Sequence, residues 1–415
     1  MLSSLAYAWL ALASRQASEP SIWGFFLAMG IAWTALLITY GASQRAPFSE
    51  EVHVKRWPIA LLFSLVAATS FAQQPVPEIP FTADAEFLKL PADLHLGEAS
   101  GIAVNSKGSV FVFNRGNAIG PAYAATASQL LEFDKTGKFV REIGRNLYAW
   151  SFAHTVRIDR DDNIWAVDKG SDMVIKFNPE GRVVMVFGRK KEASDEAGPW
   201  TRVTPPRPHV DGNFRQPTDV TWDTQGNIFI SDGYINSRVA KFDKNGDWVK
   251  SWGEKGAKPG EFDTPHSIAA DARGNIYVAD RGNKRIQAFD PDGKFLREMK
   301  LDVPVPPDAR PAIGNRPTAE TAATQQAGAP WAVCITPGPN QVLYAADAYP
   351  GRLYKLTLDG KILGVLGKAG KQPKQFGWIH EIACPSENDL YVAEILNWRV
   401  QKLTLHPDAR QTASR

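Results

Sequence analysis

Three histidines are the first residues in this sequence whose placement indicates chemistry. The 415-residue chain contains seven histidines, and His154, His266 and His380 occupy the same place in a repeated unit, two residues before the first aliphatic residue of an apolar run. One such histidine alone more often bonds a neighbouring backbone group. Three in one register can bind a metal ion and leave a fourth position for water or substrate, as in zinc sites. Copper and iron accept the same ligands.

The units that carry these histidines predict a β-propeller. Six segments share a turn, a short apolar run and a closing acidic or amide residue, and further apolar runs follow each of them. Four short strands in a repeat of about 40–50 residues are typical of a propeller blade. Because the closing residue recurs in every unit, we expect it to bond turn amides rather than to do chemistry. The closing residues are Asn114, Asp168, Asp232, Asp280, Asp347 and Glu394.

The ends of the chain predict how the ring closes. The sixth unit stops after its third strand, and residues 85–91, before the first unit, resemble a fourth strand. We therefore expect an all-β, six-bladed propeller over residues 85–406, closed by an N-terminal strand that completes the last blade. The histidines lie in the second, fourth and sixth blades, about 120° apart around such a ring, so they converge on its axis.

The first 80 residues differ from the rest. Residues 22–40 carry no charge and are long enough to span a bilayer. Residues 54–73, with Lys55 and Arg56 before an apolar core, are typical of a signal peptide. Either residues 1–53 precede the true start of translation, or the two apolar segments form a membrane hairpin. Both interpretations predict a periplasmic or secreted propeller that touches the membrane only through the N-terminal segment.

Composition narrows the partners. The net charge is +3 and no basic block stands out, which argues against nucleic acid as a partner. Cys334 and Cys384 occupy nearly equivalent places in the fifth and sixth units, and either a disulfide or two buried thiols is consistent with that. We expect a monomer.

Residues 231–289 carry a specific resemblance. This segment resembles the core of the peptidyl-α-hydroxyglycine α-amidating lyase family, and the repeats are similar to NHL repeats over about residues 85–405. The resemblance implies an NHL-type six-bladed propeller, in agreement with the count of units. It also implies a zinc-dependent carbon–nitrogen lyase that cleaves a peptidyl α-hydroxyglycine into a peptide amide and glyoxylate.

The resemblance also implies roles for single residues. His154, His266 and His380 match the zinc ligands. Tyr234, in a D-G-Y-x-N-S-R motif, matches a catalytic tyrosine, and Tyr349 competes with it because it has the same offset in "DAYPG". Arg115, in "FNRG", and Arg281 match active-site arginines that bind a substrate carboxylate or tune the tyrosine. The alternatives without a catalytic role are that Tyr234 is an aromatic residue packed on the rim, and that Arg115 and Arg281 are solvated charges in turns.

A structural calcium ion is implied as well. Its ligands match the carbonyl groups of Ile102 and Val156 and the side chain of Glu381, which stands where the family has the shorter Asp. The substrate expected for the whole site is a small molecule or peptide with a carboxylate, or another small carbinol or lactone. The alternative function is a non-catalytic propeller that binds a protein or carbohydrate, for which no metal is needed.

Overall fold

The computed structural model describes residues 76–116, 128–191 and 203–406. The extension of residues 1–53 and the signal-like segment of residues 54–73 lie outside these ranges, so both remain predictions. Within the described ranges, no helix is long and apolar enough to cross a membrane.

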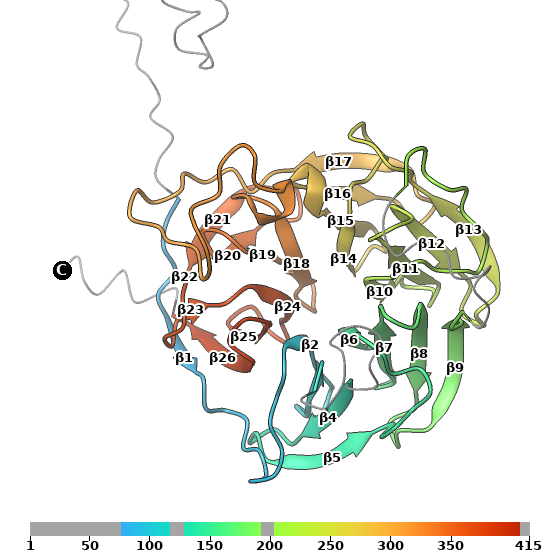
Figure 1. Cartoon of the computed structure of the whole chain (residues 1–415), viewed down its shortest axis with the longest axis horizontal. Helices are drawn as coiled ribbons and strands as arrows, with labels where there is room; N and C mark the ends of the chain where they lie inside the picture. Colours follow the sequence, from blue (N-terminus) through green and yellow to red (C-terminus); the bar gives the residue numbers. More distant parts are fainter. Residues whose placement is uncertain (1–75, 117–127, 192–202, 407–415) are drawn as a thin grey trace, which may run out of the picture. The chain divides into compact units, whose positions relative to one another are not determined.

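Six four-stranded antiparallel sheets make up the described part of the chain and follow one another around a ring (Figure 1). Blade one contains β2 (Ala99–Val104), β3 (Val110–Asn114), β4 (Gln129–Phe133) and β5 (Phe139–Ile143). Blade two contains β6 (Ala153–Ile158), β7 (Ile164–Asp168), β8 (Met173–Phe177) and β9 (Val183–Gly188). Blade three contains β10 (Asp219–Trp222), β11 (Ile228–Asp232), β12 (Arg238–Phe242) and β13 (Trp248–Trp252).

The remaining blades repeat the same order. Blade four contains β14 (Pro265–Ala270), β15 (Ile276–Asp280), β16 (Arg285–Phe289) and β17 (Phe295–Met299). Blade five contains β18 (Pro330–Ile335), β19 (Leu343–Asp347), β20 (Leu353–Leu356) and β21 (Ile362–Leu366). Blade six contains β24 (Ile379–Ala383), β25 (Asp389–Glu394), β26 (Arg399–Leu405) and β1 (Phe81–Asp84). The short pieces are β22 (Lys368–Ala369), β23 (Gln375–Phe376) and the 3₁₀ turns η1 (Arg281–Asn283) and η2 (Ala323–Gln325).

Burial explains the hydrophobic pattern of each blade in the sequence. The second strands, such as β3 and β11, are buried at every position because neighbouring blades cover both of their faces, which requires a continuous apolar run. The outer strand β17 alternates between partly buried and exposed side chains, as expected where one face meets solvent. The predicted all-β, six-bladed fold is thus confirmed.

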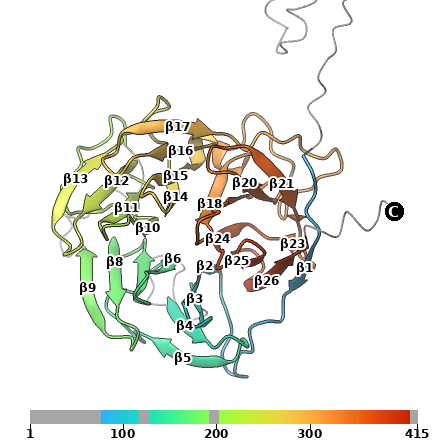
Figure 2. The same cartoon turned by 180° about the vertical axis from the view of Figure 1, so that it is seen from behind.

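The ring closes through the N-terminus, but not through the predicted segment. β1 pairs antiparallel with β26, with Thr82 opposite Thr404, and Figures 1 and 2 both show the two strands side by side. The prediction that residues 85–91 form this strand is wrong. Their apolar side chains, including Phe87, instead fill the core between the last and first blades, and Lys89 N–H donates to the Gly137 carbonyl at 2.7 Å. A short apolar segment that packs into a core has the same hydrophobic pattern as an edge strand, so the sequence does not distinguish them.

The recurring acidic residues hold turns, as expected. The Asp168 carboxylate accepts the N–H groups of Ser151 at 2.8 Å and Ser171 at 3.0 Å. In blade five, Asp347 accepts the N–H groups of Gly351 and Arg352, both at 3.0 Å. These buried carboxylates therefore secure the loops that carry the next residues along the chain.

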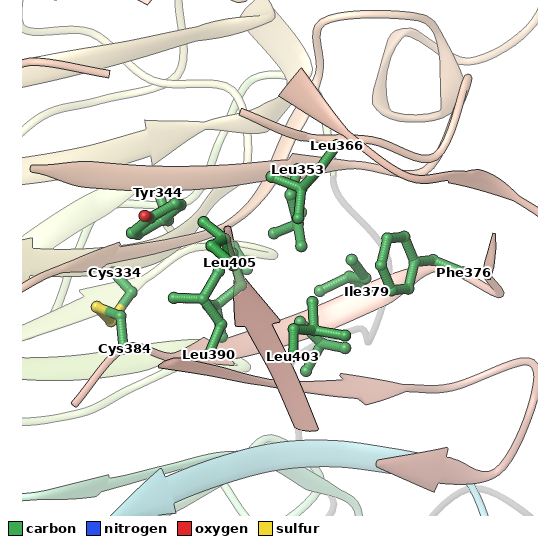
Figure 3. Packing of buried hydrophobic residues seen from close by; sticks show 14 of the residues in the cluster. Cys334, Tyr344, Leu353, Leu366, Phe376, Ile379, Cys384, Leu390, Leu403 and Leu405 are labelled. Atoms are coloured by element: carbon green, nitrogen blue, oxygen red, sulfur yellow. A yellow bond between two sulfur atoms is a disulfide. The ribbon is translucent and has the colours of Figure 1, made fainter. Parts of the chain in front are cut away.

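Cys334 and Cys384 form a disulfide. Cys334 lies on β18 and Cys384 directly follows β24, so the bond links blades five and six. Figure 3 shows it beside Leu390 and Tyr344 in a buried apolar cluster. Of the two alternatives left open by the sequence, the structure contains the bridge.

Replacing both cysteines, as in Cys334→Ala with Cys384→Ala, should lower the free energy of unfolding by about 2–4 kcal/mol, because the bond closes a long loop. The sequence separation is 50 residues. Denaturant titration measures the change. A reducing agent should lower the midpoint of the wild type and leave the double variant unchanged. Equal midpoints of the wild type with and without reductant would show that the bridge contributes nothing.

Candidate metal centre and its surroundings

Each of the three histidines lies at a β-bulge in the innermost strand of its blade. The pairing of β6 with β7 shifts register between Ala153 and Thr155, on either side of His154. The same shift flanks His266 in β14 and His380 in β24. An extra residue at a bulge changes the direction of its side chain. The bulges therefore turn one imidazole from every second blade toward the same place.

The imidazoles meet in a compact buried cluster. One nitrogen from each ring lies within 4.8 Å of the others, and the ring centroids are 4.6–4.9 Å apart. His154 and His266 are fully buried and His380 is 2% exposed. The convergence expected from the register is therefore present in the structure.

A backbone carbonyl of the next blade orients each imidazole. Because a carbonyl only accepts hydrogen bonds, the Nδ1 atom of each ring is protonated and donates, and Nε2 keeps its lone pair. The acceptors stand at the same register position as the histidines, but in the odd-numbered blades. The pairs are His154 with Thr218 O at 2.5 Å, His266 with Trp331 O at 2.6 Å, and His380 with Ser100 O at 2.7 Å.

The cluster is electrically suited to a metal ion. Burial lowers the pKa of all three imidazoles well below the usual value, and nearby positive charges lower it further. The rings are therefore neutral at neutral pH, with nitrogen lone pairs available for coordination. Three buried neutral imidazoles with oriented Nδ1–H groups can hold a metal ion, and imidazole suits zinc, copper and iron.

The hydroxyl of Tyr234 lies against this cluster. Tyr234 follows β11, and its Oη atom is 3.0 Å from Nε2 of His266 and 3.3 Å from Nε2 of His154. Of the two tyrosines at equivalent offsets, the structure thus brings Tyr234, and not Tyr349, into hydrogen-bonding distance of two of the imidazoles. A group at this distance can exchange a proton with a ligand bound at the cluster.

Three cations surround Tyr234: Arg115, Lys169 and Arg281. The Lys169 ammonium is 3.9 Å from the centre of the Tyr234 ring, and the Arg281 guanidinium is 5.5 Å from it. The Arg115 guanidinium stacks 4.0 Å from the Phe152 ring and pairs with Glu98. Burial alone would raise the pKa of Tyr234, but the three cations together lower it.

Lys169 is the residue that sequence reasoning missed. It directly follows Asp168, the closing residue of its unit, just as Arg115 and Arg281 follow Asn114 and Asp280. That shared register is the signal that identifies it. The repeat thus places a cation after the second strand in blades one, two and four.

Buried apolar residues also lie next to the histidine cluster. Trp331, Ala348 and Ile395 are buried together, and Trp378 and Leu396 pack against them. The Trp331 ring centroid is 5.4 Å from that of His266, and the Arg281 guanidinium lies 4.2 Å from the Trp331 ring. These residues come from blades five and six. A ligand bound at the histidines would therefore have both cations and indole and aliphatic groups near it, with Arg281 close to both Tyr234 and Trp331.

The residues predicted to hold calcium do come together, but they do not fit that ion. The Glu381 carboxylate accepts the backbone N–H groups of Ile102 at 2.9 Å and Val156 at 3.1 Å. Its other oxygen is 3.0 Å from Nε of Arg157. Calcium requires oxygen ligands with free lone pairs. The Oε2 atom already accepts two N–H groups. The Oε1 atom accepts no hydrogen bond within the described residues, since Nε of Arg157 donates to Oδ1 of Asp219 at 2.9 Å, but the guanidinium beside it would repel a second cation.

Comparison with known proteins agrees with this architecture. A family model described as a 6-bladed beta-propeller matches residues 213–309. Peptidyl-glycine alpha-amidating monooxygenase A of Xenopus laevis is 29% identical over 332 residues, covering 73% of this chain and 31% of that protein. Peptidyl-alpha-hydroxyglycine alpha-amidating lyase 1 of Drosophila melanogaster is 25% identical over 338 residues, covering 75% of this chain and 57% of that protein. A probable lyase of the same name in Caenorhabditis elegans is 29% identical over 191 residues, covering 41% of this chain and 50% of that protein.

Fold and site together define a class, the six-bladed β-propeller with three histidines gathered at its axis. Within that class the chain is similar to proteins named peptidyl-α-hydroxyglycine α-amidating lyase, at 25–29% identity, which confirms the resemblance found in the sequence. The chain spans 31–57% of the length of the three relatives described above.

Zinc added to metal-free protein should raise the midpoint of thermal unfolding, because a ligand that binds only the folded state stabilises it, by about 2.7 kcal/mol at a hundredfold excess over Kd. Elemental analysis should then find about one zinc ion per chain. His266→Ala should abolish both effects, whereas His95→Ala, a change at an exposed histidine, should preserve them. Equal zinc responses in the two variants would place the ion elsewhere.

Proposed function

We propose that the protein is a zinc-dependent carbon–nitrogen lyase that cleaves a carbinolamide into an amide and glyoxylate. The observation that carries the proposal is the Tyr234 hydroxyl, 3.0 Å from one histidine of a buried three-histidine cluster and flanked by cations. The lyase names of relatives at 25–29% identity support it.

The residues have distinct roles in the proposed reaction. Zinc held by the three histidines would supply Lewis acidity at the substrate hydroxyl. Tyr234, as phenolate, takes the proton of that hydroxyl. The oxygen then forms a carbonyl, the C–N bond breaks, and its electron pair passes to the nitrogen, which receives a proton and leaves as the amide. Positive charge around Tyr234 stabilises the phenolate that this step needs.

The surroundings of the cluster define the substrate class. Lys169 and Arg281 face the ring of Tyr234 and are suited to a carboxylate next to the reacting carbon. Arg115 already pairs with Glu98, which balances its charge. Trp331 and its apolar neighbours suit a hydrophobic group on the amide side of the substrate.

Release of glyoxylate from α-hydroxyhippurate by the zinc-loaded protein tests the function. Tyr234→Phe should reduce kcat by about a hundredfold or more, since a positioned proton acceptor contributes that much, while zinc content stays unchanged. Tyr349→Phe, a matched change at the equivalent offset in blade five, should retain the wild-type rate. If the protein binds zinc but releases no glyoxylate, the proposed metal site stands and the proposed substrate is wrong.

Lys169→Met should lower kcat/KM for the carboxylate substrate by about 10–100-fold, the worth of one charge-assisted hydrogen bond. The loss should be smaller on the carboxamide analogue, which has no charge to bind and reports only the effect of Lys169 on Tyr234. Lys244→Met, a change at an exposed turn, is the control. An equal loss on both substrates would mean that Lys169 does not bind the carboxylate and acts only through Tyr234 or the local structure.

We also propose that the propeller works outside the cytoplasm. The buried Cys334–Cys384 bond supports this location, since such bonds persist mainly in oxidising compartments. The signal-like composition of residues 54–73 points the same way.

A further inference from the structure

A single guanidinium connects most of the blades at the axis. Arg157 lies on β6 of blade two, three residues after His154, and its side chain is 13% exposed. Its Nη2 atom is 2.6 Å from Oδ2 of Asp219 in blade three and 3.2 Å from Oγ of Ser267 in blade four. Nη2 also donates to the main-chain carbonyl of Val333 in blade five at 3.3 Å, and Nη1 donates to that of Ile382 in blade six at 3.4 Å.

Glu381 extends this cluster to the remaining blade. Its Oε1 atom pairs with Arg157, and its Oε2 atom accepts N–H groups from blades one and two. A Cβ atom placed on Gly101 would lie 3.1 Å from Oε2 of Glu381, so the small residue at this position leaves room for the carboxylate. Glu381 is one residue beyond His380 on β24, directly after the bulge. The ionic cluster thus neighbours the histidines along the innermost strands.

Asp219 accepts hydrogen bonds at both of its carboxylate oxygens, including one from Nε of Arg157 to Oδ1 at 2.9 Å. Its Oδ2 atom accepts from Oγ of Ser267 at 2.8 Å and from the N–H of Ile268 at 3.0 Å, and its Oδ1 atom accepts from the N–H of Val220 at 2.8 Å. Both carboxylates are essentially unexposed, at 0% and 1%. Two buried carboxylates would require a divalent cation or an equivalent partner, since lone buried charges are strongly unfavourable.

We propose that the guanidinium of Arg157 is the internal cation of this propeller, standing where the lyase resemblance implies calcium, so that the ring is held at its axis without a calcium ion. A planar guanidinium carries five donors and can bind both carboxylates and the carbonyls at once. Calcium would demand six to eight oxygen ligands from the same residues. The remaining negative charge is shared among the backbone N–H groups of Ile102, Val156, Val220 and Ile268.

The test compares calcium binding and thermal unfolding of the full chain, with zinc present throughout so that the histidine cluster stays loaded. The wild type should contain no stoichiometric calcium by elemental analysis, and its midpoint should not change between calcium-free buffer and millimolar calcium. One calcium ion per chain, or a midpoint that falls when calcium is removed, would overturn the proposal without bearing on the lyase activity.

Arg157→Met leaves the two carboxylates without their cation. Its midpoint should fall by about 5–10 °C, as for loss of one partner of a buried ion pair, and millimolar calcium should restore part of that loss. Arg238→Met is the matched control, since it removes a buried arginine that pairs with the single carboxylate of Asp232. The midpoint of Arg238→Met should also fall, but calcium should not restore it. If calcium fails to stabilise folded Arg157→Met, or stabilises both variants equally, the proposal fails.

Arg157→Lys covers the case in which Arg157→Met does not fold. Lysine keeps the charge but loses the fork that reaches several blades. Its midpoint should lie below that of the wild type and should still not respond to calcium. A calcium-stabilised Arg157→Lys protein would show that charge alone does not exclude the ion and would contradict the proposal.

Discussion

Closure of the ring is the constraint on which the other features depend. β1 pairs with β26 and completes blade six, so the sixth and first blades become neighbours. The hydrogen bond from His380 to the carbonyl of Ser100 crosses this junction, between residues 280 positions apart. Without closure, the third imidazole would have no fixed partner, and the three rings would not converge. The strand that ends the sheet therefore also supports the chemistry at the axis.

The innermost strands use adjacent residues for two different tasks. The bulge turns the histidine in blades two, four and six into the three-histidine cluster. The next residue along, Ser267 in blade four or Glu381 in blade six, bonds to the layer around Arg157. The histidine cluster and the ionic cluster are thus carried by the same innermost strands. Because the ionic cluster is held in place, the histidines can move little. Such support from surrounding residues is typical of preorganised metal sites.

A repeated scaffold becomes an asymmetric site by variation at one position. The residue after the closing acidic or amide group is a cation in blades one, two and four, but Ala348 and Ile395 occupy it in blades five and six. The result is that cations and apolar side chains from different blades gather around one cluster. The individual chemistry of this chain therefore depends on such positions rather than on the fold.

The sequence by itself determined the blades and the histidine register, because strands, turns and the place of a residue in a repeat are local patterns. Tertiary structure decided the rest. It selected β1 over residues 85–91 as the closing strand, chose the disulfide for Cys334 and Cys384, and paired Glu381 with Arg157. Each of these outcomes joins residues far apart in the chain. Which groups meet there depends on how six blades pack around one axis, and no local pattern carries that information.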